Sequence, residues 1–266
     1  MRNGIALAAC LLTHLWVGSA LAQDFRIETE VFRGESTEPI SENLTLFSDN
    51  LILDFMLPTD RTRFPEQIVI FISDERKFVL LDTRRRLKTE LLEGQVLQFL
   101  STLQSSTLAN EENDFLFHPE FKEEYDHSSG LLRLYSDQIT YEVRGERPKE
   151  DTILHRYYEF IGQFARLNAT DPKRMPPFAR LKLNSALKKY GFIPQEVQLT
   201  LVPSLTEAKD PIVLRTTHNV ITELSAKDEK RIESAKRYWI DFKNVSLGEF
   251  RNFEKTALLP QGEEDR

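Results

Sequence analysis

The chain of 266 residues contains one cysteine, Cys10, which lies in the first apolar segment. A single thiol cannot close a disulfide within the chain, and it cannot supply the several thiolates of a structural zinc site or an iron–sulfur cluster. Glycine is also scarce, and its ten residues are spread singly, without a GxG, Walker or GxSxG motif. Phosphate-cradling loops and the nucleophile elbow of a hydrolase are therefore not predicted.

Histidine is sparse as well, and the chain has no HExxH motif. His118 and His127 flank several carboxylates, which together have the composition of a metal cluster if a loop folds them together. The segment 126–130, with the sequence DHSSG, is interpreted more simply as a hairpin turn, because Asp and Ser side chains bond nearby backbone groups. We therefore expect no metal ligand, no cofactor and no catalytic residue.

The chain lacks an excess of positive charge, since 35 Lys and Arg face 42 Asp and Glu, for a net charge of −7. A protein that reads a nucleic-acid duplex needs a basic face to displace counterions, so no nucleic-acid partner is expected. The basic run Arg84–Arg86 with Lys88 has the charge to contact anionic lipid head groups. Because it directly follows an apolar strand, we interpret it as a solvated strand end.

The first 22 residues are typical of an export signal. Arg2 supplies a positive start, an apolar stretch runs from Ile5 to Val17, and the small-x-small pattern at 20–22 precedes Gln23. Beyond this leader no apolar run approaches the ~20 residues that span a bilayer, so no transmembrane segment is expected after its removal. The sequence predicts a periplasmic or secreted protein.

The first half of the mature chain alternates like half-buried strands, beginning with Phe25–Val31. Polar turns with a Ser-Asp pair separate apolar runs and predict hairpins at 48–50, 73–76 and 136–137. The strands Ile68–Ile72 and Phe78–Leu81 are apolar at every position. Both faces of the sheet must therefore be covered there.

Amphipathic helices are available as covers. The predicted helices are Leu91–Leu103, Asp151–Leu167, Pro177–Tyr190 ending at Gly191, and a last helix from Ser225, where Asp228 completes a capping box. Strands at 196–202 and 211–224 lie between them, the second with space for a turn at His218-Asn219.

This order predicts an α+β fold in which a curved antiparallel β-sheet, shaped like a half-barrel, packs against amphipathic helices. We expect a single domain over residues 23–257, preceded by the signal peptide 1–22 and followed by a mobile tail at 258–266.

Residues 67–90 contain the strand IVIFIS, a short turn, the strand KFVLLD and the basic continuation RRRLKTEL. In a meander with inserted helices behind an export signal, this segment resembles the periplasmic lipoprotein carriers of the LolA and LolB type. The resemblance is one of pattern and covers about residues 25–224. It implies a curved sheet around helices, a cavity for acyl chains, and a lipid or lipoprotein as partner.

Three hypotheses on function remain open. The first is a non-catalytic carrier or sensor that binds a lipid or another apolar ligand between sheet and helices. The second is a cell-envelope interaction module without a ligand cavity, which uses an edge strand or the basic run Arg84–Lys88 to contact an envelope protein. The third is a hydrolase.

For the carrier, the expected ligand site lies between a sheet face and the helix Leu91–Leu103. Its expected residues are Phe55, Ile70 and Leu80 on the sheet, and Val96 and Phe99 on the helix. A cavity larger than ~300 Å³ under the sheet favours this hypothesis, and its absence favours the interaction module.

The leader generates a prediction about the mature chain. We expect cleavage between Ala22 and Gln23, so that N-terminal sequencing of the exported protein begins at Gln23. Leu7–Cys10 also resembles a lipobox, but apolar sequence continues past Cys10 where a lipobox would end the apolar region. A mature chain that starts at a lipid-modified Cys10 would contradict the prediction.

Overall fold

The computed structural model describes residues 24–57, 67–106, 114–171, 174–202 and 210–251. The expected signal peptide, its cleavage point between Ala22 and Gln23 and the expected tail at 258–266 lie outside the described residues. The domain boundaries at 23 and 257 stay a prediction.

The described strands form one sheet of twelve in the order β12-β6-β5-β4-β3-β2-β1-β11-β10-β9-β8-β7. Neighbouring strands are antiparallel, except that β12 runs parallel to β6. The strands are β1 (Phe25–Arg33), β2 (Ser41–Ser48), β3 (Leu51–Leu57), β4 (Gln67–Ile72), β5 (Lys77–Asp82), β6 (Leu87–Leu92), β7 (Lys122–Asp126), β8 (Leu131–Tyr135), β9 (Ile139–Glu146), β10 (Ile193–Leu201), β11 (Ile212–Ile221) and β12 (Lys243–Asn244).

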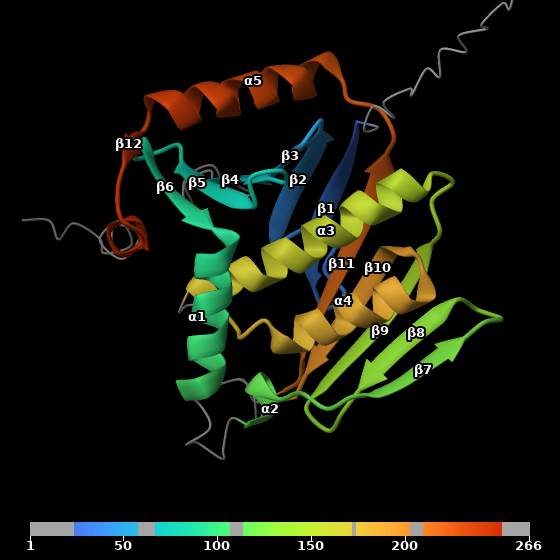
Figure 1. The fold of residues 1–266 in the computed structure, drawn as a ribbon. Coiled ribbons are helices and arrows are strands. Elements are labelled where there is room, and N and C mark those ends of the chain that lie inside the picture. The colour runs from blue at the N-terminus through green and yellow to red at the C-terminus, as the bar shows by residue number, and fades with distance from the viewer. Residues whose placement is uncertain (1–23, 58–66, 107–113, 172–173, 203–209, 252–266) are drawn as a thin grey trace, which may run out of the picture.

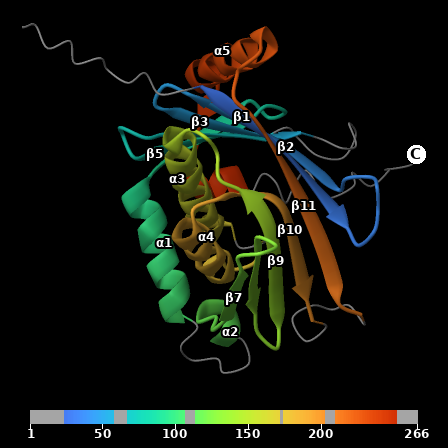
Figure 2. The ribbon, with the colours of Figure 1, turned by 90° about the vertical axis from the view of Figure 1, so that its right-hand side faces the viewer.

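The helices lie on two sides of this sheet. They are α1 (Glu93–Ser106), α2 (Asp114–Phe117), α3 (Asp151–Leu167), the 3₁₀ turn η2 (Asn168–Thr170), α4 (Phe178–Tyr190) and α5 (Ala226–Asp241). The sheet bends around α3 and α4, which lie on its inner face, while α5 lies on the outer side (Figures 1 and 2). The predicted α+β fold with a curved antiparallel sheet packed against helices is confirmed.

Strands β4 and β5 place apolar side chains on both faces, as predicted. Residues directly opposite each other in neighbouring strands share a face, and the pairs Ile70↔Val79 and Phe71↔Phe78 are adjacent in this register. Ile70 and Val79 lie in a core cluster with Ile232 of α5. The two phenylalanines belong to the larger inner core, which contains the helices α3 and α4.

The inner core is built by α3 and α4. Helix α3 spans the predicted residues Asp151–Leu167, and its Tyr157 is 1% exposed. Helix α4 contributes Leu183 and Leu187, both fully buried, and ends where Gly191 takes a left-handed conformation with φ of 75°. A residue without Cβ adopts that conformation at little cost, so Gly191 terminates the helix as expected.

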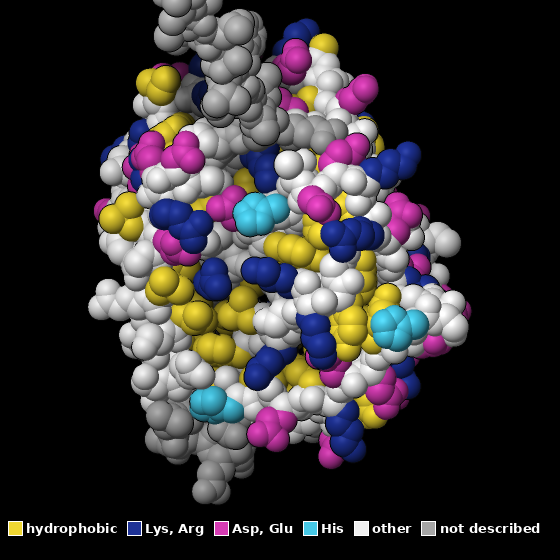
Figure 3. All heavy atoms as spheres, turned by 45° about the vertical axis from the view of Figure 1, so that its right-hand side comes forward, with side chains coloured by type: hydrophobic (Ala, Val, Ile, Leu, Met, Phe, Trp, Pro, Cys, Tyr) yellow, Lys and Arg dark blue, Asp and Glu magenta, His cyan; other side chains and the backbone are white. Residues whose placement is uncertain are grey.

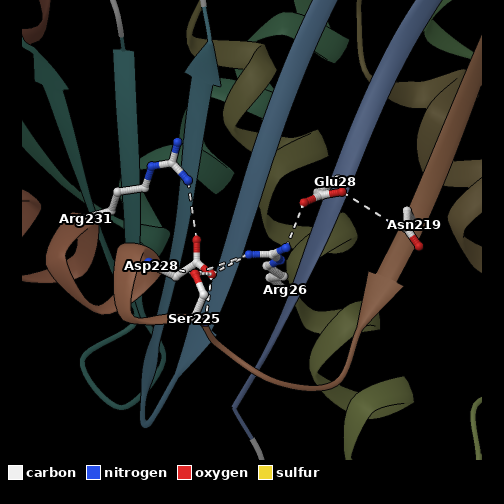
Figure 4. A network of polar contacts seen from close by, with 6 residues as sticks. All are labelled: Arg26, Glu28, Asn219, Ser225, Asp228 and Arg231. Atoms are coloured by element: carbon white, nitrogen blue, oxygen red, sulfur yellow. Dashed lines mark hydrogen bonds and ion pairs between the residues drawn. The ribbon is translucent and has the colours of Figure 1, made fainter.

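The outer helix α5 is anchored to the sheet by Asp228, which is fully buried (Figure 4). Ser225 and Asp228 form the predicted capping box. The Asp228 carboxylate accepts a hydrogen bond from Arg26 of β1 at 2.5 Å and forms a longer ion pair with Arg231 at 3.4 Å. Arg26 also pairs with Glu28 at 3.1 Å. The start of α5 is therefore tied to the strand that begins the described chain.

The far end of α5 is held by Trp239. Its indole Nε1 donates to Glu90 of β6 at 2.8 Å, and the ammonium of Lys77 lies 5.1 Å from the centre of its ring. Lys88 donates to the Trp239 carbonyl. These contacts fix α5 across β5 and β6, so that the outer apolar face remains covered along its length.

Two predicted elements differ from the structure. The helix expected from Leu91 begins at Glu93, because residues Leu87–Leu92 pair with β5 as strand β6. The turn considered at His218-Asn219 is absent from β11, which is continuous and pairs with β1 over eight residues of each strand, Arg26–Arg33 with Leu214–Ile221. Both differences have the same cause, because pairing with a neighbouring strand outweighs the local sequence preference.

Within the described residues, no helix has both the length and the apolar character required to cross a membrane.

The anchor of α5 generates a prediction on stability and its pH dependence. Burial raises the pKa of Asp228, but hydrogen bonds from Ser225 and Arg26 outweigh burial and hold the pKa below its usual range. The stabilisation is therefore present above the unfolded pKa near ~4 and is lost as the pH falls through the lower folded value. We expect Asp228→Asn to lower the free energy of unfolding by ~2–3 kcal/mol at pH 7, because Arg26 loses its charged partner.

The measurement is urea denaturation at pH 7 and near pH 3, where the difference between wild type and Asp228→Asn should shrink. Asp241→Asn is the matched control, since Asp241 is an exposed carboxylate at the end of the same helix. Equal loss of stability in both variants would show that the Asp228 anchor has no special role.

Candidate functional site

A cavity of about 400 Å³ lies between the inner face of the sheet and helix α3. Its sheet side comes from β1 to β5 and β11, and its helical side comes from α3 and the start of α4. The volume falls within the ~300–1,000 Å³ typical of ligand pockets. The sequence criterion that favours a carrier is therefore met.

One wall of the cavity is apolar. Helix α3 presents two half-buried aromatic rings, Phe160 and Phe164, whose centres lie 4.6 Å apart. The sheet also contributes apolar lining residues, including Val69 and Leu80, as does Phe250, and α3 itself adds Ile161, Ala165 and Leu167. This wall gives an apolar chain a surface of side chains with no hydrogen-bonding groups.

The facing sheet wall carries polar groups beside its apolar residues, and Asp54 is one of them. Asp54 interrupts the apolar strand β3 and accepts hydrogen bonds from Thr45 at 2.8 Å and from Asn43 at 3.1 Å. Burial raises the pKa of Asp54, although both hydrogen bonds and the charge of Arg174 act in the opposite direction. A carboxyl group in this state is more easily protonated than one in water.

Next to this group, His218 of β11 lies opposite Thr29 of β1. The His218 Nδ1 and the Thr29 Oγ1 form a hydrogen bond of 3.0 Å. Burial and the charge of Arg180 lower the pKa of His218 to about 3, so its ring is neutral at physiological pH. The other ring nitrogen, Nε2, is buried and has no hydrogen-bond partner among the described residues.

Three arginines lie at the border of the cavity, and two of them are paired. Arg174 contacts the Asp171 carboxylate at 3.4 Å, and Arg251 contacts the same carboxylate at 3.2 Å. Arg180, in the first turn of α4, is half-buried and has no hydrogen bond or ion pair to any residue that the structure describes. The border of the cavity therefore carries one positive charge, on the α4 side, that has no ion pair within the described structure.

The sequence-predicted site residues are not brought together. Leu80 lines the cavity, while Phe55 and Ile70 belong to the outer core beneath α5. The expectation that these three residues share one face is wrong, because Ile70 pairs with Val79, the neighbour of Leu80 in sequence. Successive residues of a strand point to opposite faces.

The predicted helical side of the site also differs. Val96 is fully buried in the inner core, and Phe99 is 42% exposed. Neither lines the cavity, since α3 covers the polar strands where α1 was expected. Whether Phe55, Ile70, Val96 or Phe99 contacts a ligand stays a prediction.

Sequence reasoning missed the polar wall. Asp54 stands alone among apolar residues in LILDFML, and His218 follows two threonines in β11. A polar residue inside an otherwise apolar strand was the available signal. From the sequence, no functional role was assigned to either residue.

The structure places His118 and His127, the two histidines considered as metal ligands, outside the cavity. His127 lies in the predicted hairpin turn, where Ser128 and Ser129 donate to Asp126. No group of three or more possible metal-ligating side chains occurs in the described part of the chain. His118 does not line this cavity but a separate pocket beside α2 and α4.

The basic run is only partly a solvated strand end. Arg84 and Arg86 are exposed, as predicted. Arg85 instead pairs with the buried Asp82 at 2.7 Å and donates to the Phe250 carbonyl at 3.2 Å, so it holds the chain that follows α5.

The chain matches no known family model and no curated protein. Among solved structures it is similar to PNGF-II, at 11% identity and a TM-score of 0.31, over 77% of this chain and 30% of that one. The chain thus spans less than a third of PNGF-II. It is also similar to a LolA superfamily protein from Nitrosomonas europaea, at 7% identity and a TM-score of 0.30, over 77% of this chain and 87% of that one. Both scores are low, and neither likeness transfers a function.

The two sides of the sheet can be compared by a pair of substitutions. Ile70→Ala removes packing beneath α5 and should cost ~2–5 kcal/mol of unfolding free energy. Leu80→Ala should cost less, ~2 kcal/mol or below, because part of the Leu80 side chain faces the cavity and makes fewer contacts. Urea denaturation of both variants measures the difference, and equal losses would mean that Leu80 borders a filled core.

Proposed function

We propose that this chain is an exported, non-catalytic binding protein whose cavity takes an amphiphile, a molecule with an apolar chain and a polar head. The observation that carries the proposal is that aromatic rings on the α3 wall face buried polar groups on the sheet wall. The α3 wall offers Phe160 and Phe164 to the chain, and the sheet wall offers Asp54 and His218 to the head. A lipid or a lipid-modified protein has this chemistry.

The polar wall explains why an amphiphile is preferred to a purely apolar ligand. Burial of a polar group without a partner costs free energy, and the buried His218 Nε2 has no partner among the described residues. A ligand head that bonds this atom recovers the cost, whereas a hydrocarbon cannot. The apolar wall alone would also accept hydrocarbon.

A hydrolase is the second candidate, since the Thr29–His218 hydrogen bond is the first contact of a nucleophile and its base. Two observations weigh against it. The pKa of His218 is lowered to about 3, far from the range of an effective general base at neutral pH. Asp54 accepts its hydrogen bonds from Asn43 and Thr45 and not from the imidazole, so this carboxylate does not orient the ring.

An interaction module that uses a sheet edge is also less well supported. Strand β7 forms one edge of the sheet, and its sequence KEEYD is charged and mostly exposed. Charged edge strands resist pairing with another chain.

The proposal is tested by filling the cavity. Ala165 of α3 lines the cavity, so Ala165→Met should fill open space and weaken binding of the neutral apolar dye N-phenyl-1-naphthylamine at least ~10-fold, with a stability change below ~1 kcal/mol. Ala179 of α4 is 3% exposed in the packed core and does not line the cavity. Ala179→Met should therefore lose ~1–3 kcal/mol and keep dye binding.

Dye fluorescence titration and urea denaturation measure the two effects. Native mass spectrometry of the wild type should in addition reveal a co-purifying lipid. If the wild type binds no dye and carries no adduct, or if Ala165→Met binds the dye as well as the wild type does, the amphiphile site does not exist.

A further inference from the structure

We infer that the head group of the amphiphile is an anion, a carboxylate or a phosphate, which Arg180 and His218 bind together at the polar end of the cavity. This inference rests on the proposed function and specifies its ligand class. Among the described residues around the cavity, the positive charge of Arg180 has no acidic partner.

The arginines around the cavity differ in how they are neutralised. Asp171 is nearly buried and receives both Arg174 and Arg251, so one carboxylate serves two cations. Arg180 has no such partner among the residues described, although it is half-buried. A guanidinium that is partly removed from water favours an anionic partner, and it offers donors in the planar arrangement that carboxylates and phosphates accept.

Arg180 and His218 both line the cavity. The charge of Arg180 lowers the pKa of His218 and opposes the raised pKa values of Tyr141 and Tyr157, all three of which point to the inner side of the sheet. The guanidinium therefore acts inward, toward the cavity, and not only toward solvent.

His218 supplies a second donor at the same end. Its ring is neutral, and when Nδ1 accepts the Thr29 hydroxyl proton, the hydrogen of the ring lies on Nε2. This Nε2 is the buried atom without a partner in the described structure. An N–H donor and a guanidinium that line the same cavity can together bind an oxyanion, and they reject a cationic head group.

Asp54 is the one carboxyl group on the polar wall, and it opposes an incoming anion least when protonated. Burial raises its pKa, which reduces the cost of protonation when the anion enters. Its two oxygens are also already occupied by Thr45 and Asn43. The hydrogen bonds from Thr45 and Asn43 thus hold the carboxyl group along the sheet.

Arg180 differs from the other cations of its helix. Helix α4 also carries Lys182, Lys188 and Lys189, and it has no acidic residue. On the face of the molecule drawn in Figure 3, Lys and Arg side chains are interspersed with apolar ones. Lys182 is exposed, so its charge is screened by salt, and its position two residues from Arg180 makes it a matched control.

The experiment measures displacement of N-phenyl-1-naphthylamine from the full chain in 0.15 M salt. The competitors share a twelve-carbon chain and differ in the head: laurate, dodecyl phosphate, dodecanol and dodecyltrimethylammonium. The wild type should bind laurate and dodecyl phosphate ~10-fold or more tightly than dodecanol, and the cationic competitor most weakly. Inorganic phosphate alone should displace the dye poorly, because it lacks the chain.

The variants assign the preference to residues. Arg180→Gln should remove most of the difference between laurate and dodecanol while dodecanol affinity stays unchanged, and His218→Leu should remove part of it. Lys182→Gln should preserve it. Circular dichroism melts verify that each variant is folded; if His218→Leu does not fold, Arg180→Gln decides.

The outcomes separate the inference from the proposed function. If dodecanol and laurate bind the wild type equally, or if Arg180→Gln keeps the preference, the anionic head is wrong while the amphiphile site stands. If no twelve-carbon competitor displaces the dye, the proposed function fails. If inorganic phosphate binds as tightly as dodecyl phosphate, the site is one for a free anion and the inference is overturned.

Discussion

The apolar character of β4 and β5 on both faces is the constraint on which the rest of the structure depends. A strand pair with Ile70 and Val79 on one side and Phe71 and Phe78 on the other cannot face water on either side. The inner side is covered by α3 and α4, which come from the middle of the chain. The outer side is covered by α5, which comes from near the end of the chain. Helix α5 therefore closes the fold, and its anchor is the buried pair of Asp228 with Arg26.

The cavity exists because the inner face of the sheet changes character along its strands. Near the turns between strands the inner face carries phenylalanines that fill the space against α3. Further along, Thr29, Asn43 and Asp54 occupy the same face and bond sideways to other residues of the sheet. Side chains that bond along the sheet do not extend toward the helix, so the rings of Phe160 and Phe164 face open volume. The same polar groups that leave the space also define what can occupy it.

Charge is distributed unevenly around this space. The chain is acidic overall, with a net charge of −7, yet the end of the cavity near α4 is basic and includes a guanidinium without a partner in the described structure. Elsewhere the buried carboxylates Asp82, Asp171 and Asp228 are each paired with arginine. Charges removed from water are usually paired, whereas the half-buried Arg180, which lines the cavity, has no ion pair with any described residue.

The sequence by itself determined the fold class, the hairpins, helix α3, the end of α4 and the start of α5. These features depend on local signals such as period-two alternation, Gly191 and the Ser225 cap. It also identified Leu80 as a candidate, but grouped it with Phe55 and Ile70, which lie on the opposite face. Only the tertiary structure decided which helix covers which face, converted residues 87–92 into a strand, and brought Asp54 and His218 into one cavity. The physical reason is that alternation along a strand shows which residues share a face, but the partner on each face comes from helices that lie far away in the sequence.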